Sequence, residues 1–370
     1  MRILHLQYDH PQNPWLGGGG AKYVHEIYRR LCRRHEVTVM TGGWPGAPRE
    51  QVIDGVRYLH AGPGLGRIQS QICYGVRAGL RALRRDHDLL VDSVSPFCPT
   101  FAGTLTRGPS IADIGLDLYG SARRFRALSP ILTALLRRNL RGHRHFIAVA
   151  PGLERLLREK LGNGIDVRVV PLGVDQELFA LESEEAPCLL FLGRLDIEHK
   201  GLDCLLDAYS LFKQRHPRIG LVIAGSGPEE QKLRRMAEER GLGQAITWAG
   251  WVTGSARSDL LRRCLALCIP SRREGWPIVV NEAGACGKPA IGFNTVGVCD
   301  VIRDGETGLL VPYEDTPALA DAMGRLVDDA PLRHTLGHNA RRWAEQFTWD
   351  RTAEGYERYY EEVVARWRSR

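Results

Sequence analysis

The pattern of apolar and polar positions divides the chain into short apolar runs separated by amphipathic segments. In the first half, strands are predicted over Arg2–Gln7, Glu36–Thr41, Leu89–Asp92, Phe146–Val149 and Val167–Val170. In the second half, they are predicted over Cys188–Gly193, Gly220–Ala224, Ala245–Ala249, Ala266–Pro270 and Pro289–Phe293. Continuous apolar strands that alternate with helices are typical of parallel sheets covered on both faces. The pattern therefore predicts an α/β protein with two doubly wound, Rossmann-like domains.

An acidic and poorly periodic stretch, residues 181–187, separates the two series of strands. We expect a first domain over 1–180, a linker over 181–187 and a second domain over 188–348. The last helical pattern, within 349–370, follows without a further strand. Two doubly wound domains are expected to face each other across a cleft. Since ligands of such sheets bind at the carboxyl ends of the strands, the chemistry should lie just after the strands.

The composition is that of a globular protein, with 44% hydrophobic and 25% charged residues, and it excludes disorder. No apolar run approaches the roughly 20 residues of a spanning helix, and the first residues read as a strand and not as a signal peptide. The nine cysteines are scattered, Cys264 and Cys268 being the closest pair. Reduced thiols are expected, without disulfides or a zinc site. We therefore expect a cytosolic protein.

Positive charge gathers in the first half of the chain. Residues 1–180 carry 25 Lys and Arg against 15 Asp and Glu, whereas residues 181–370 carry 25 against 28. A stretch without acidic residues contains Arg123, Arg124, Arg126, Arg137, Arg138, Arg141 and Arg144. It includes a helix predicted from Ser129 to a stop at Gly142. This is either an ordinary helix with arginines near its negative end, or a docking site for an acidic or membrane-borne acceptor at the inner membrane face. Because aromatic and basic residues do not alternate, nucleic acid is not an expected partner.

The segment with the most specific chemistry is Pro270–Ala283. It follows an apolar strand and opens a helix, with Pro277 suited to the first helical position. The amides at a helix N-terminus can receive a diphosphate. Glu274 in the loop and Glu282 in the helix can accept hydrogen bonds from sugar hydroxyls. The alternative is a capped helix with two surface glutamates.

A second motif ends the first strand of the second half. It begins with Gly193 and Arg194 and closes with Lys200 and Gly201. Arginine binds phosphate in a bidentate fork and lysine adds a point charge, so the two could neutralise a diphosphate. Taken alone, such a pair also occurs in exposed loops.

Two glycine-rich turns complete the set. Gly225 and Gly227 follow a strand, and Gly17–Gly20 open the helix expected over Lys22–Arg34. Glycine lets backbone approach a ligand closely, and a helix N-terminus attracts an anion. The alternatives are a simple strand-to-helix turn for the first and a flexible loop for the second.

Several motifs, in this order, resemble glycosyltransferase family four: Pro171–Asp175, Arg194 with Lys200, Glu274-x7-Glu282, Ala283–Pro289 and Asp304–Pro312. The resemblance covers nearly the whole chain and is densest in 188–315. It implies the GT-B fold and a retaining, metal-independent hexosyltransferase without a cofactor. The donor would be a UDP- or GDP-type sugar, and the acceptor a polysaccharide, a lipid-linked glycan or a small-molecule glycan.

The resemblance also assigns roles to residues. Arg194 and Lys200 would bind the donor diphosphate, Glu274 the transferred sugar and Glu282 the ribose. The other donor-binding residues it implies are Gly18, Gly19, Gly20, Gly193, Gly225, Gly227, Trp251, Val252, Ser271, Gly275, Trp276, Ile278 and Val279. Among these, the backbone near Trp251 and Val252 would read the base. The amides of Gly275 and Trp276 would approach the sugar, and the amides after Pro277 would approach the phosphate. The final helix would cross back to the first domain.

The sequence departs from the family at three positions. Asp113 stands where the family commonly has a histidine beside the sugar, Leu172 where it often has asparagine, and Pro277 where it often has glycine. Asp113 is therefore expected as a sugar-side catalytic residue that favours a donor or acceptor with an amine or a well-placed hydroxyl. The alternative is a nucleotide-sugar-binding protein whose catalysis is impaired.

Two other classes are less consistent with the sequence. A dinucleotide-binding dehydrogenase needs G-x-G-x-x-G after a strand, but Lys22 and Tyr23 occupy the positions of the third glycine. Asp86-His87-Asp88 matches the D-x-D metal motif of a different glycosyltransferase fold. It precedes a strand far from the donor motifs, so no metal site is expected. The sequence does not specify the base, the sugar, the acceptor or the oligomeric state.

Overall fold

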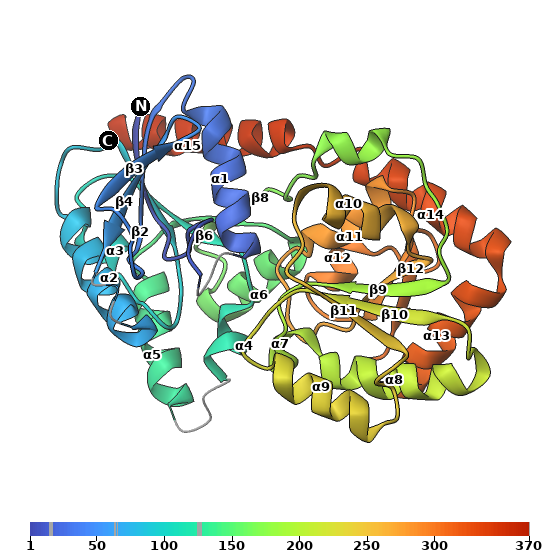
Figure 1. Ribbon diagram of the computed structural model, residues 1–370. Coiled ribbons are helices and arrows are strands. Elements are labelled where there is room, and N and C mark those ends of the chain that lie inside the picture. The colour runs from blue at the N-terminus through green and yellow to red at the C-terminus, as the bar shows by residue number, and fades with distance from the viewer. Residues whose placement is uncertain (15–17, 63, 65, 124–127, 370) are drawn as a thin grey trace. The chain divides into compact units, whose positions relative to one another are not determined.

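The computed structural model describes residues 1–14, 18–62, 64, 66–123 and 128–369 (Figure 1). The chain divides into two compact units. The first comprises Met1–Gly173 together with Trp349–Arg370, and the second comprises Val174–Thr348. Each is an α/β unit built on one sheet.

The first unit contains an eight-stranded sheet in the order β3-β4-β2-β1-β5-β6-β7-β8. The strands are β1 Arg2–Leu6, β2 Glu36–Gly42, β3 Glu50–Ile53, β4 Val56–Ala61, β5 Leu89–Ser93, β6 Ser110–Ile114, β7 His145–Ala148 and β8 Asp166–Val169. The edge strand β3 is antiparallel to β4, and all other neighbours are parallel. The parallel strands therefore end at one edge of the sheet.

Helices surround this sheet and bury its apolar faces. They are α1 Gly19–Leu31, α2 Arg67–Ala82, α3 Ala102–Leu105, α4 Leu118–Arg123, α5 Ser129–Leu140, α6 Pro151–Leu161 and α15 Trp349–Arg368. The last helix packs beside α1, where the hydroxyls of Tyr28 and Tyr360 lie 3.0 Å apart. Among the described residues, no helix combines the length and apolar character that crossing a membrane would require.

The second unit contains a six-stranded parallel sheet in the order β11-β10-β9-β12-β13-β14. The strands are β9 Cys188–Leu192, β10 Gly220–Ala224, β11 Ile246–Gly250, β12 Ala266–Ile269, β13 Ala290–Phe293 and β14 Gly308–Val311. From β9 the chain proceeds outward to β10 and β11 and then returns to the opposite side of β9 to form β12.

The helices of the second unit lie on both faces of its sheet (Figure 1). A 3₁₀ helix covers Gln176–Ala180. The α-helices are α7 Ile197–Lys200, α8 Leu202–Arg215, α9 Glu230–Glu239, α10 Gly254–Arg263, α11 Ile278–Ala285, α12 Val298–Val301, α13 Thr316–Asp328 and α14 Ala330–Ala344. Helix α8 packs beside α9 and α13, whereas α11 packs beside α10 and α14.

All ten strands predicted from the apolar runs are present, and their ends differ by at most one residue. The apolar pattern does not predict β3, β4 or β14, and the family resemblance alone implied β6. β3 and β4 form an edge hairpin. β3 alternates exposed and half-buried residues and β4 is only partly buried, unlike the continuous buried runs of the central strands. Its turn, Asp54 with φ 48° and Gly55 with φ 82°, is a D-G hairpin signal that the sequence did carry.

The acidic stretch 181–187, expected as a linker, lies inside the second unit, which begins at Val174. The amide of Ala186 donates to the carbonyl of Arg263 at 2.8 Å. Both carboxylate oxygens of Glu185 accept hydrogen bonds from the Arg333 guanidinium, at 2.9 and 2.7 Å. Because backbone and side chains of this stretch are bound to the second unit, its weak periodicity does not mark the boundary between the units.

Candidate functional site

The order of strands in the second unit singles out one point on its sheet. Strands β10 and β11 lie on one side of β9, and β12, β13 and β14 lie on the other. The loops that leave β9 and β12 therefore run in opposite directions from neighbouring strand ends. In doubly wound sheets this reversal of strand order creates the crevice in which ligands bind. Residues 193–201 and 270–277 flank that point in this chain.

The structure brings Lys200 and Glu274 together at this point, although 74 residues separate them in the sequence. The Lys200 ammonium donates to Oε1 of Glu274 at 2.6 Å. Glu274 is 7% exposed, whereas the Lys200 side chain is 24% exposed. Lys200 Cε would lie 3.9 Å from a Cβ placed on Gly193, so the lysine passes over the end of β9. The ammonium and the carboxylate thus form an ion pair that is partly shielded from solvent.

Local sequence explains how Lys200 reaches this position. Asp196 caps the short helix α7, its carboxylate accepting from the His199 amide at 3.0 Å. Helix α7 ends at Gly201, which has a φ of 62°. A Cβ at Gly201 would lie 2.0 Å from the Pro270 carbonyl oxygen. Glycine is therefore required there both for the left-handed backbone and for the contact with the loop after β12.

The loop that carries Glu274 is held by residues that the sequence motifs did not indicate. The amide of Arg272 donates to the His199 carbonyl at 2.9 Å. The Arg272 guanidinium binds both carboxylate oxygens of Asp203, at 2.8 and 2.9 Å. On the other side, a Cβ at Gly297 would lie 2.7 Å from the carbonyl oxygen of Glu274. The loop is therefore fixed between α7 and the segment after β13.

Helix α11 begins at Ile278, with Pro277 as its N-cap and not as its first helical residue. The side chain of the N-cap residue accepts no hydrogen bond from the helix, so the first amides of the helix, including those of Ile278 and Val279, have no side-chain cap. Glu282 is fully buried and forms an ion pair with Arg257 of α10. Arg257 is one of three arginines in α10 and gave no sequence signal, so only the packing of α10 on α11 reveals this partner.

Three buried polar atoms in the same segment have no hydrogen-bond partner in the part of the chain that is described. They are Ser271 Oγ, Trp276 Nε1 and Asn281 Nδ2. The Trp276 ring packs edge-on against Phe347, with centroids 5.0 Å apart, so its side chain has a structural role. Unpaired buried polar groups are uncommon in proteins, and their presence beside the switch point is consistent with a polar ligand.

The glycines after β10 have a role other than the expected one. A Cβ at Gly225, which has a φ of 147°, would lie 1.8 Å from the Gly193 carbonyl oxygen. A Cβ at Gly227 would lie 2.2 Å from the Leu195 carbonyl oxygen. The two loops therefore pack backbone against backbone, and this contact explains both glycines without a ligand. Arg194 belongs to the first of these loops, just after β9, and is half-buried.

The structure places Trp251 and Val252 just after β11. Trp251 is 58% exposed. The carbonyl of Gly250 accepts from the Gly225 amide at 2.7 Å, so this segment adjoins the loop after β10. An exposed aromatic side chain at the carboxyl end of a strand can stack on a base, and the base-reading role of these residues stays a prediction.

Gly18, Gly19 and Gly20 belong to the first unit, whereas Gly17 lies outside the described residues. Gly18 is the N-cap of α1, and the helix begins at Gly19, three residues before the predicted start. A Cβ at Gly20 would lie 3.0 Å from a carboxylate oxygen of Asp9. Gly20 therefore packs tightly against a side chain of the loop after β1.

Asp113 is buried inside the first unit. It lies next to the last residue of β6 and is 1% exposed. Both of its carboxylate oxygens accept hydrogen bonds, from the hydroxyl of Tyr23 at 2.9 Å and that of Tyr356 at 3.0 Å. Burial raises the pKa of Asp113 to about 6. Asp113 thus joins α1 and α15 to the sheet, and the sugar-side role expected from the sequence stays a prediction.

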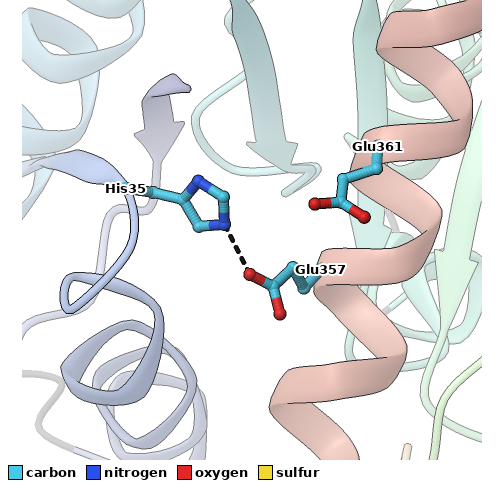
Figure 2. Close-up of side chains that lie close together, drawn as sticks. All are labelled: His35, Glu357 and Glu361. Atoms are coloured by element: carbon cyan, nitrogen blue, oxygen red, sulfur yellow. Dashed lines mark hydrogen bonds and ion pairs between the residues drawn. The ribbon is translucent and has the colours of Figure 1, made fainter.

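Among the described residues, one group of His, Cys, Asp and Glu side chains brings ligand atoms within 4.8 Å of one another: His35, Glu357 and Glu361 (Figure 2). His35 Nε2 lies 2.6 Å from Oε1 of Glu357. The guanidinium of Arg34 lies 2.7 Å from the other oxygen of the same carboxylate. With a guanidinium already neutralising Glu357, the group is an ion-pair network that anchors α15.

The Asp86-His87-Asp88 sequence has a similar structural role. The Asp86 carboxylate accepts from Arg81 at 2.5 Å. Asp88 accepts from the backbone amide of Arg2 at 2.8 Å and from its guanidinium at 3.3 Å. Both carboxylates therefore serve ion pairs of the first unit.

The structure describes only part of the basic stretch from Arg123 to Arg144. Arg124 and Arg126 lie outside the described residues, as does the side chain of Arg123. Helix α5 covers Ser129–Leu140 as the sequence predicts, with Leu136 and Leu140 buried. Ile131 of the same helix is 58% exposed. The structure of this helix is compatible with both interpretations of the stretch.

Two family models match the chain in succession. The model described as Glycosyltransferase Family 4 matches residues 17–178, and the one described as Glycosyl transferases group 1 matches residues 175–343. The second range contains Arg194, Lys200, Glu274 and Glu282.

Similar curated proteins include a D-inositol 3-phosphate glycosyltransferase of Corynebacterium jeikeium, 32% identical over 218 residues, which are 53% of this chain and 52% of that protein. The chain spans about half the length of the first curated relatives it matches. A GDP-mannose-dependent alpha-(1-6)-phosphatidylinositol monomannoside mannosyltransferase of Mycolicibacterium smegmatis is 25% identical over 372 residues, covering 88% of this chain and 90% of that protein.

Solved structures show the same fold. The sucrose-phosphate synthase of Thermosynechococcus elongatus is 20% identical, with a TM-score of 0.84 over 99% of both chains. The Anabaena protein HepE in complex with UDP-glucose is 18% identical, with a TM-score of 0.75 over 97% of this chain and 99% of that one. These similarities confirm the GT-B fold expected from the sequence.

Proposed function

Because the chain belongs to glycosyltransferase family 4, we propose that it moves a sugar from a nucleoside diphosphate sugar to an acceptor. The observation that carries this proposal is the Lys200–Glu274 pair beside the point where the second sheet reverses its strand order. Lysine suits a diphosphate and a carboxylate suits sugar hydroxyls. Both recognition elements lie within hydrogen-bond distance of each other.

In the proposed reaction, the bond between the anomeric carbon and the diphosphate breaks. Negative charge then grows on the departing diphosphate while positive charge develops on the sugar. Lys200, Arg194 and the first amides of α11 would stabilise the diphosphate. Glu274 would bind hydroxyls of the sugar, and Glu282 the ribose. We propose that a hexose is transferred with retention of configuration, with the diphosphate as the base and without a metal ion.

The names of similar proteins suggest which donors and acceptors to test first. GDP-mannose is the donor named for the mycobacterial relative, and UDP-glucose is bound to the Anabaena protein. Inositol phosphate and phosphatidylinositol mannoside appear in the names of the relatives. We propose these two chemical classes, a phosphorylated polyol and a glycolipid, as the first acceptors to assay.

The decisive experiment incubates the protein with an equimolar mixture of nucleotide sugars and identifies the retained one by mass spectrometry. The retained donor is then assayed for hydrolysis and for transfer, and NMR of the product gives the anomeric configuration. Retention of one donor followed by turnover supports the proposal. Retention without any turnover would favour a binding protein with impaired catalysis, and failure to retain any nucleotide sugar would contradict both.

The Glu274→Gln variant is expected to transfer sugar roughly tenfold more slowly and to discriminate less between sugars, because a charge-assisted hydrogen bond to the sugar is lost. The Kd of the free nucleoside diphosphate should stay nearly unchanged. Isothermal titration beside transfer assays measures both quantities. Glu238→Gln, an exposed glutamate of α9, is the matched control. Loss of nucleotide affinity with intact sugar discrimination would mean that Glu274 faces the nucleotide.

Replacing Arg194 by lysine is expected to restore only part of the turnover that Arg194→Ala loses. An ammonium carries the charge but cannot form two parallel hydrogen bonds to a phosphate. Steady-state kinetics of the two variants gives the comparison, with Arg218→Lys, an exposed arginine of the same unit, as control. Equal rates for Arg194→Lys and the parent would show that charge alone matters at this position.

A further inference from the structure

The loop that carries Glu274 is tied to three other segments of the second unit by the side chain of Arg272. This side chain is 14% exposed. Besides the two hydrogen bonds to Asp203 of α8, its Nη1 donates to the carbonyl of Ile197 in α7 at 2.8 Å. Its Nε donates to the carboxylate of Glu314, which follows β14. Because Arg272 stands two residues before Glu274, these contacts determine where that part of the loop lies.

Glu314 binds Arg272 from a backbone conformation that favours glycine. Its φ is 58°. It is the third residue of the turn that joins β14 to α13, in which the Asp315 amide donates to the Pro312 carbonyl at 3.1 Å. A positive φ at the third position of a turn usually selects glycine, and another residue there is under backbone strain. The turn alone therefore does not explain a glutamate, whereas the bond of its carboxylate to Arg272 does.

The contact with α7 concerns the other half of the candidate site, because Lys200 is the last residue of that four-residue helix. A helix this short has little stability of its own, so its position depends on what it is bound to. Next to Arg272, the guanidinium of Arg273 lies 3.5 Å from the carboxylate of Glu198, also in α7. The segments that carry Lys200 and Glu274 are therefore bound to each other as well as to the sheet.

Arg272 is poorly suited to bind a diphosphate itself. Its guanidinium faces two carboxylates, those of Asp203 and Glu314. Each of its three nitrogens already donates to an acceptor within the second unit. A guanidinium with its charge neutralised and its donors occupied can position other groups but has little left to offer a ligand.

We propose that Arg272, held by Asp203 and Glu314, is a positioning residue that keeps Glu274 and Lys200 at the spacing a nucleotide sugar requires. The diphosphate and the sugar of such a donor are covalently joined, so the ammonium and the carboxylate recognise it together only if their two segments keep that spacing. Losing the spacing weakens binding of the sugar part more than binding of the bare nucleotide. This inference rests on the proposed function.

Two variants loosen these contacts in different ways. Arg272→Lys keeps a positive charge but cannot bind both oxygens of Asp203. Glu314→Gly removes one carboxylate and relieves the backbone strain, so it should keep the parent melting temperature. In both, we expect the affinity for the nucleotide sugar relative to the nucleoside diphosphate to fall about tenfold, the cost of one charge-assisted hydrogen bond. Isothermal titration with UDP-glucose and UDP, and with GDP-mannose and GDP, gives this ratio.

A double variant shows whether Arg272 acts through Glu274. In the Glu274→Gln background, Arg272→Lys should lower the affinity ratio no further, since the carboxylate that it positions is already neutral. A residue that only stabilises the fold would lower the melting temperature and leave the ratio unchanged. Arg240→Lys, which weakens an ion pair to Asp207 of the same helix α8, is the matched control and should keep the parent ratio.

The outcomes separate this inference from the function on which it rests. Lowered ratios in both single variants, without additivity in the double variant, support the positioning role. Parent-like ratios in Glu314→Gly and in folded Arg272→Lys, or additive effects in the double variant, would overturn it while the parent still binds and transfers sugar. A parent that binds neither nucleotide sugar and transfers none would contradict the proposed function, and the role of Arg272 with it.

Discussion

The Lys200→Ala variant is expected to turn over nucleotide sugar about a hundred- to a thousandfold more slowly than the parent, the usual cost of losing one group that stabilises developing charge. The negative charge on the diphosphate is largest as the sugar leaves. An interaction that strengthens at that stage acts on kcat and only modestly on nucleotide affinity. Initial rates at saturating donor, beside titration with the nucleoside diphosphate, measure the two effects.

The structure adds a complication to this variant, because removing Lys200 leaves the nearly buried Glu274 without its ion-pair partner. The double variant Lys200→Ala/Glu274→Gln removes that unpaired charge and should recover stability but not turnover. Lys232→Ala, on an exposed lysine of α9, should behave as the parent. If Lys200→Ala has the parent kcat, the donor site lies elsewhere in the protein.

Asp113→Asn is expected to raise the free energy of unfolding at pH 7 by up to about 3 kcal/mol, and by little at pH 4. The pKa of Asp113 is raised to about 6 by burial. A carboxyl with a raised pKa binds its proton more tightly in the folded than in the unfolded chain. Its contribution to stability is therefore greatest near pH 4, falls as pH rises towards 6 and stays low above it. Asparagine keeps the shape and removes the buried charge.

Denaturant unfolding of parent and variant between pH 4 and 8 tests this prediction. The difference in unfolding free energy should grow up to about pH 6 and then level off, while kcat stays near the parent value because Asp113 lies inside the first unit. Asp54→Asn, on an exposed aspartate, is the control. A large change in donor preference with unchanged stability would return Asp113 to the sugar-side role expected from the sequence.

The central strands were predictable because both of their faces are buried. β9 and β12 read as continuous apolar runs. β9 is followed by Gly193 and Arg194, and β12 is followed by Pro270, so the sequence also indicates where each strand ends. The hairpin β3–β4 lies at a sheet edge, where alternate side chains are exposed and an apolar run does not form. Only the Asp54-Gly55 turn could have revealed it.

The candidate site was predictable as a set of residues but not as an arrangement. Lys200 and Glu274 each follow a strand, but their contact depends on β9 and β12 being neighbours, which local patterns do not encode. The Arg257–Glu282 pair depends likewise on helix packing. The contacts of Asp113 were not predictable, because its partners, Tyr23 and Tyr356, are 90 and 243 residues away in the sequence.

The ion pair between Lys200 and Glu274 has a consequence for product release. Any ligand that binds there must replace both halves of the pair, offering an anion to the ammonium and hydroxyl donors to the carboxylate. A complete nucleotide sugar supplies both. In the proposed donor site, the nucleoside diphosphate left after transfer would supply only the anion and would lack the hydrogen bonds to Glu274 that a complete donor makes. The spent nucleotide would therefore be held less well than a fresh donor, which favours their exchange.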